Sequence, residues 1–149
     1  MQRLPWIAAL LAACLSLPLP ALAQEMFGSY YTALGPQDFY NSSGRQLTDF
    51  GAILQQDRAN FHRFNRRDAS DEGDPFFANR DLRAAIPALF AAGDNAWWRD
   101  RVTPVTQTRG EADVLVILCG RGGRLTHLIV NHANGDGYTT CRGRVTAGD

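Results

Sequence analysis

The pattern of hydrophobic and polar positions predicts an early strand followed by helices. Residues 27–34 are rich in strand-forming side chains and end at a Gly-Pro pair, so we expect an extended segment there. Apolar positions then recur at helical spacing. Thr48 is suited to cap this helix and Asp49 to lie in its first turn, so the helix should run to about Phe64.

A second helical region follows an acidic, glycine-containing loop. Asn79 can cap a helix that continues through Ile86. Pro87 should either kink this helix or start a new turn, because proline lacks the backbone N–H that a helix interior needs. Gly93 is a natural stop after the last apolar residues.

The last third of the chain has the pattern of a sheet. Residues 102–108 read as extended, and Pro104 suggests an edge position. Residues 114–118 form a continuous apolar run, which fits a central strand covered on both faces. Two further segments, 125–131 and 138–145, are joined to it by glycine-rich turns. Together these segments predict an antiparallel C-terminal meander.

Helices followed by paired strands predict an α+β fold, with two or three helices packed on a small antiparallel sheet. Cys119 and Cys141 should form a disulfide if the protein is exported. In a tight meander, however, Cys119 would lie opposite about Arg124 and Cys141 opposite about Ile129. That offset is roughly 16 Å, whereas a disulfide needs Cα atoms within about 7 Å. We give the disulfide precedence and expect the last strand to depart from the meander.

The first residues have the layout of a secretory signal. Arg3 gives a positive start, residues 4–17 are almost wholly apolar, and residues 21–23 form a small-x-small exit. An alternative reading places a lipid anchor on Cys14, within a Leu-Ala-Ala-Cys box. Either route exports the protein, and neither provides a transmembrane segment. Residues 24–149 should then form one domain in the periplasm or outside the cell.

Composition excludes several classes of function. The chain has fifteen basic and fifteen acidic residues, so no overall field attracts nucleic acid. Every basic residue is arginine, and without lysine neither a Schiff-base site nor a P-loop can form. Arginine can still hold carboxylates or phosphates through two parallel hydrogen bonds.

The predicted helix over residues 48–64 carries one polar residue out of place. On a helical wheel Asp57 falls in the middle of the apolar face, and Asn60 lies at its edge. Arg58 and His62 fall towards the other flank. The apolar face itself consists of Phe50, Ile53, Leu54, Phe61 and Phe64.

Asp57 has two readings. A carboxylate on a buried stripe must find a cation, accept backbone N–H groups or become neutral. It is therefore either a tuned acid or ligand-anchoring group, with His62 as an assisting base, or an internal tie. The partners expected for such a tie are loop N–H groups or one of Arg80, Arg83 and Arg99.

A Trp-Trp-Arg sequence supplies the remaining binding candidates. Adjacent aromatic residues in an extended segment face opposite ways, so Trp97 or Trp98 could lie near solvent beside Arg99. Such a pair can stack a sugar, a base or a partner's side chain. The alternative is that both tryptophans are wedged between helix and sheet. The binding candidates are thus Asp57, Asn60, Trp97, Trp98 and Arg99.

No metal or cofactor site is expected. The acidic loop at 68–73 places oxygen ligands at alternate positions, whereas the loop at 132–137 begins with His132, and neither has the glutamate that completes a calcium loop. His127 and His132 are five residues apart on one predicted strand and should face opposite sides. The sequence also lacks the G-x-S-x-G and H-E-x-x-H motifs.

These observations favour a non-enzymatic binding or interaction module with an unidentified protein or small-molecule partner. A small periplasmic hydrolase or lyase that uses Asp57 as general acid or base is the first alternative. A structural accessory protein without a small-molecule ligand is the second. A concave pocket that exposes Asp57 would favour the enzyme, whereas an exposed tryptophan would favour binding.

Overall fold

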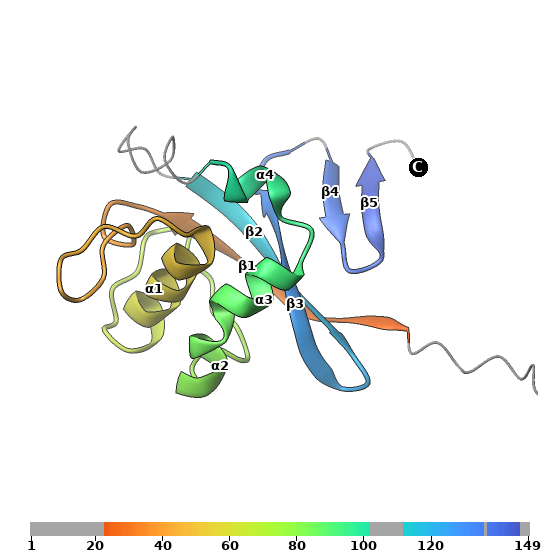
Figure 1. The fold of residues 1–149 in the computed structure, drawn as a ribbon, viewed down its shortest axis with the longest axis horizontal. Helices are drawn as coiled ribbons and strands as arrows, with labels where there is room; N and C mark the ends of the chain where they lie inside the picture. The colour runs from red at the N-terminus through yellow and green to blue at the C-terminus, as the bar shows by residue number, and fades with distance from the viewer. Residues whose placement is uncertain (1–22, 102–111, 136, 147–149) are drawn as a thin grey trace, which may run out of the picture.

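A computed structural model describes residues 23–101, 112–135 and 137–146. The predicted signal segment with Cys14, and the extended segment predicted at 102–108, lie outside these residues. The described elements, in chain order, are β1 (Gln24–Leu34), α1 (Phe50–His62), α2 (Arg80–Ala84), α3 (Ile86–Ala92), α4 (Ala96–Arg99), β2 (Ala112–Arg121), β3 (Arg124–His132), β4 (Gly137–Thr140) and β5 (Gly143–Thr146) (Figure 1). None of the described helices is long and apolar enough to cross a membrane.

The larger sheet has three antiparallel strands in the order β1-β2-β3. Its central strand is β2, in which Val116 pairs with Tyr30 on one side and Val130 on the other. β4 and β5 form a separate two-stranded sheet. The helices and antiparallel sheet confirm the predicted α+β class.

Alternate residues of β2 serve two apolar clusters, one on each face of the sheet. The helix-covered face forms the main core with α1, α3 and Trp98 of α4 (Figure 1). Its sheet residues are Tyr30, Leu34, Val114, Val116, Leu118, Leu128 and Val130. The opposite face carries a smaller cluster of Ile117, Cys119, Ile129 and Cys141. The run at 114–118 is therefore a central strand with buried residues on both faces, as predicted.

The first helix begins and ends slightly inside its predicted bounds. Its N-cap is Asp49, whose Oδ1 accepts the N–H of Ala52 at 2.8 Å, rather than Thr48. Its last residue is His62. Phe64 lies beyond the helix and is 43% exposed, so its assignment to the apolar face was wrong. The helical periodicity had been extended one half-turn too far.

The predicted second helix is two short helices. Asn79 caps α2 as expected and accepts the N–H groups of Asp81 and Leu82. Pro87 lies in the first turn of α3, where its missing N–H costs nothing, and Gly93 ends that helix. A Cβ atom at Gly93 would lie 1.9 Å from the carbonyl oxygen of Leu128, so only glycine allows this close approach to β3.

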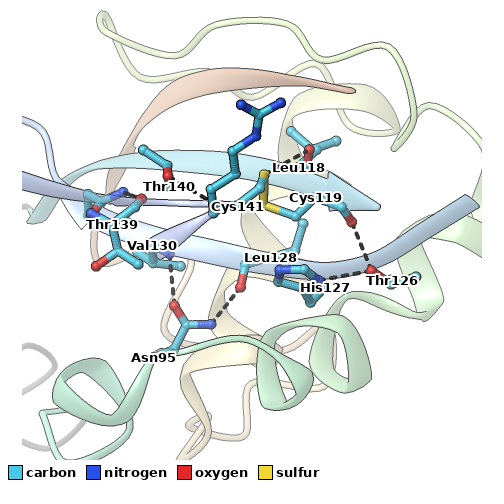
Figure 2. Close-up of a disulfide and its surroundings, with 12 residues drawn as sticks. Asn95, Leu118, Cys119, Thr126, His127, Leu128, Val130, Thr139, Thr140 and Cys141 are labelled. Carbon is cyan, nitrogen blue, oxygen red and sulfur yellow. Dashed lines mark hydrogen bonds between the residues drawn. A yellow bond between two sulfur atoms is a disulfide. The ribbon is translucent and has the colours of Figure 1, made fainter. Parts of the chain in front are cut away.

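The disulfide between Cys119 and Cys141 is present, with a Cα–Cα distance of 5.4 Å (Figure 2). The single strand predicted at 138–145 was wrong. It is two strands, β4 and β5, and they form their own hairpin instead of extending the main sheet. Asn131 links this hairpin to β3 because its amide bonds both the N–H and the C=O of Thr139. The covalent bond and these hydrogen bonds replace the ladder that a meander would need.

Candidate functional site

The structure separates the predicted site residues into two places. Asp57 and Asn60 lie on the buried face of α1, and each is 2% exposed. Trp97 and Trp98 line a surface pocket at the outer edge of β3. Arg99 belongs to neither place, because its guanidinium is exposed and donates to the carbonyl oxygen of Ala91 at 3.3 Å.

The interior site is built around Arg58, which is fully buried. Arg58 was predicted towards the other flank of the apolar face, and the structure buries it completely. Its Nε donates to Asp57 Oδ2 at 2.7 Å, and its two terminal nitrogens donate to the Thr32 hydroxyl and the Glu72 carbonyl, each at 2.8 Å. The planar guanidinium thus donates hydrogen bonds to β1, to its own helix and to the loop before α2.

Aromatic rings cover the same guanidinium. Arg58 Cζ lies 4.2 Å from the ring centroid of Tyr30 and 4.6 Å from that of Phe61. Contacts of this kind stabilise a desolvated cation by up to about 2 kcal/mol. A buried arginine was invisible to the helical wheel, because its partners lie on other elements.

The pKa of Asp57 reflects both its burial and its contact with Arg58. Burial raises the pKa of Asp57 to about 6, while the charge and hydrogen bonds of Arg58 oppose the rise. The predicted ties to Arg80, Arg83 or Arg99 were wrong. One carboxylate oxygen contacts Arg58 at 2.7 Å, and the other accepts the Thr32 hydroxyl at 3.0 Å. Asp57 therefore acts as an internal tie between α1 and β1.

His62 is paired with a buried carboxylate. Its Nε2 lies 2.7 Å from Asp74 Oδ2, and the histidine side chain is 12% exposed. Burial acts to raise the pKa of Asp74, but hydrogen bonds from His62 and from the N–H groups of Phe77 and Phe76 lower it below its ordinary value. No hydrogen bond among the described residues joins His62 to a serine, threonine or cysteine.

Asn60 has a structural role beside a second buried carboxyl group. Its Nδ2 donates to Asp38 Oδ1 at 2.8 Å, and Asp38 Oδ2 accepts the N–H of Gly35 at 2.9 Å. Burial raises the pKa of Asp38 to about 7, and nearby Asp57 adds to the rise. These bonds fix the turn after β1 against α1.

We expect stability to fall between about pH 4 and pH 7 because of Asp38 and Asp57. In that window the unfolded carboxyl groups are ionised while the folded ones retain protons, so raising the pH favours unfolding. Each retained proton contributes a slope of up to about 1.4 kcal/mol per pH unit. Urea unfolding across this range should give a shallower slope for Asp38→Asn than for the native chain. Equal slopes would contradict the assignment to Asp38.

The surface pocket has a volume of about 300 Å³ and lies between α4 and the edge of β3. Trp97 is 44% exposed, whereas Trp98 is 3% exposed and donates its indole N–H to the Val130 carbonyl at 2.9 Å. The two tryptophans lie on a short helix and not on the extended segment assumed from sequence. One is nevertheless buried and the other exposed, so the reading with both wedged into the core was wrong.

Asn95 fixes the pocket to the sheet, and sequence reasoning missed it. Its Nδ2 donates to the Leu128 carbonyl, and its Oδ1 accepts the N–H of Val130, each at 2.8 Å (Figure 2). The same Nδ2 donates to the Phe90 carbonyl, also at 2.8 Å. The side chain is 1% exposed. The only local signal was its place after Gly93, at the start of the Trp-Trp segment.

His132 completes the aromatic wall. Its ring centroid is 4.3 Å from that of Trp97 and 4.6 Å from that of Trp98, and the Arg101 guanidinium lies 4.2 Å from the Trp97 centroid. No hydrogen bond among the described residues uses the His132 ring nitrogens or the carboxylate of exposed Asp94, which also lines the pocket.

The register confirms that the two strand histidines face opposite sides of the sheet. His127 pairs with Cys119 on the disulfide face, and His132 pairs with Val114 on the helix face. Burial and the charge of Arg121 lower the pKa of His127. Within the part of the chain that the structure describes, no group of three His, Cys, Asp or Glu side chains could hold a metal ion.

Comparison with known proteins assigns no family: no family model matches the chain, and no curated protein or solved structure shows significant similarity to it. The chemistry of the site therefore rests on its own geometry.

Proposed function

We propose that the protein is an exported, non-enzymatic binding module whose ligand site is the aromatic pocket between α4 and β3. The observation that carries this proposal is the exposed indole of Trp97 beside His132 and Asp94, two polar side chains with no hydrogen bond among the described residues. A tryptophan that is half exposed beside polar groups offers a ligand an apolar ring face and hydrogen-bonding partners together, which is typical of binding surfaces. Export rests on the signal-like pattern of the first 23 residues.

The pocket suits a small, polar and uncharged molecule with one apolar side. Its volume of about 300 Å³ is at the lower end of the range for ligand pockets. The Trp97 indole would pack against the apolar side, while the imidazole of His132 and the carboxylate of Asp94 would bond hydroxyl groups. The negative charge of Asp94 disfavours phosphorylated ligands here. Sugars of one or two rings have this chemistry.

The enzyme alternative has less support. Asp57 is 2% exposed, and both of its carboxylate oxygens are occupied by Arg58 and Thr32. A general acid or base must reach the proton that it transfers, through at most one water. An accessory protein without any ligand is the competing outcome of the experiment below.

Substitution of Trp97 tests the proposed site. Glucose, N-acetylglucosamine, maltose and cellobiose would be titrated into the purified protein and followed by calorimetry and tryptophan fluorescence. Where a sugar binds, Trp97→Ala should weaken its affinity at least about tenfold, because the apolar contact is lost. Tyr40→Ala is the matched control, since Tyr40 is 47% exposed and lies before α1, away from the pocket-lining residues.

Two results would overturn the proposal. One is binding that Trp97→Ala leaves unchanged, which would place the ligand elsewhere. The other is an absence of binding to every sugar together with a bare native mass for protein taken from its own exported fraction. That second result would favour the accessory-protein alternative.

A further inference from the structure

A second hollow, of about 240 Å³, lies between α1 and α2 and is lined by three arginines. Arg63 follows the last turn of α1, whereas Arg80 and Arg83 belong to α2. None of the residues that line this arginine groove is acidic. Although the whole chain has no net charge, the residues that line this hollow carry three positive charges and no negative one.

The groove arginines have no ionic partner among the described residues. Among the described residues, the only cations in ion pairs are Arg58 and His62. Arg63 and Arg80 are exposed. Arg83 is held in place because one of its terminal nitrogens donates to the carbonyl oxygens of Phe77 and Ala78. That anchoring leaves its other N–H groups without a hydrogen bond to the described residues.

Three arginines line one hollow, and no carboxylate among its lining residues offsets their positive charge. The Arg63 guanidinium has a ring contact, with Cζ 5.0 Å from the Phe64 centroid, and no carboxylate partner among the described residues. An oxyanion in this hollow would offset the positive charge and would accept charge-assisted hydrogen bonds from the arginines. Guanidinium groups match the planar oxygens of carboxylates and the oxygens of phosphates better than ammonium groups do. The arginine groove would therefore select a ligand by its negative charge and by the geometry of its oxygens, whereas the aromatic pocket would select one by ring contact and hydroxyl groups.

We propose that the groove between α1 and α2 is an oxyanion-binding site, formed by Arg63, Arg80 and Arg83. Its ligand carries phosphate or clustered carboxylate groups, either as a free molecule or as the headgroup of an anionic lipid. This site shares no residue with the aromatic pocket and stands independently of the proposed function.

The test is a binding titration of the full chain at constant ionic strength. The probes are inorganic phosphate, citrate, and vesicles of phosphatidylcholine with and without phosphatidylglycerol. Arg80→Gln and Arg63→Gln should each weaken binding at least about tenfold, since each removes one charged donor. Arg142→Gln is the matched control, because Arg142 is exposed in the turn between β4 and β5. Added sodium chloride should weaken binding of the native chain.

The probes separate the two sources of the anion. Binding of phosphate or citrate with no preference for phosphatidylglycerol would identify a soluble ligand, and binding to anionic vesicles alone would identify a lipid headgroup. An absence of binding to all probes, or equal affinities for the native chain and both groove variants, would overturn the proposal. Thermal unfolding of each variant is the folding check. The two substitutions lie on different segments, so misfolding of one leaves the other informative.

Discussion

Arg58→Met is expected to destabilise the protein by about 3–5 kcal/mol, because it leaves the Asp57 carboxylate buried without its cation. Three donors to Asp57, Thr32 and Glu72 and the contacts with two aromatic rings would be lost together. Urea unfolding followed by circular dichroism would measure the change in the free energy of unfolding.

Arg63→Met is the matched control for this substitution. Arg63 is exposed just after α1, so its replacement should change stability little. The loss at Arg58 should be smaller in acid than at neutral pH, because Asp57 can then take up a proton. Asp57→Asn in the same chain should recover part of it. Similar small effects at Arg58 and Arg63 would show that the buried cluster contributes little.

Replacing both Cys119 and Cys141 with serine is expected to cost about 3–4 kcal/mol, because the bond closes a loop between residues 22 apart. The first element released should be the β4–β5 hairpin, since a two-stranded sheet is marginal on its own and the disulfide, together with Asn131, ties it to the main sheet. Hydrogen exchange at the Thr139 N–H would report this release.

Reduction of the native protein provides the control. Dithiothreitol should lower its stability to that of the double serine variant and leave the variant itself unchanged. A loss below about 1 kcal/mol, with Thr139 still protected, would mean that the hydrogen bonds of Asn131 suffice to hold the hairpin. Because Thr139 also lines the aromatic pocket, its release should open that pocket on one side.

The polar features of this protein divide by exposure into interior ties and surface sites. Asp57 and Arg58 are almost fully buried, so their charges are balanced internally and serve the packing of α1 on β1. Trp97 and Arg80 are exposed, and the groups around them have unused hydrogen-bonding capacity among the described residues. The two hollows differ in their lining: the aromatic pocket combines aromatic rings with neutral polar groups and the carboxylate of Asp94, whereas the arginine groove combines three arginines with neutral residues and has no acidic one.

The sequence by itself determined the fold class and most helix and strand positions, because these depend on local signals. Strand-forming side chains marked β1, a continuous apolar run marked β2, and Asn79 and Gly93 marked helix ends. The presence of only two cysteines after the predicted signal segment predicted the disulfide. The carboxylate of Asp57 was recognised as misplaced because periodicity alone shows a polar residue on an apolar face.

Only the tertiary structure decided which groups meet. Arg58 is buried because β1 and the loop before α2 supply acceptors and a ring for it, and no periodicity within α1 could show those partners. The aromatic pocket needed His132 of β3 beside α4, and the groove needed arginines from two segments. The disulfide holds Cys141 with its Cα 5.4 Å from that of Cys119, a distance that pairing of residues 138–145 in a tight meander would not allow, and β4 and β5 form their own sheet. Such contacts join residues far apart in the chain, and local propensity carries no information about them.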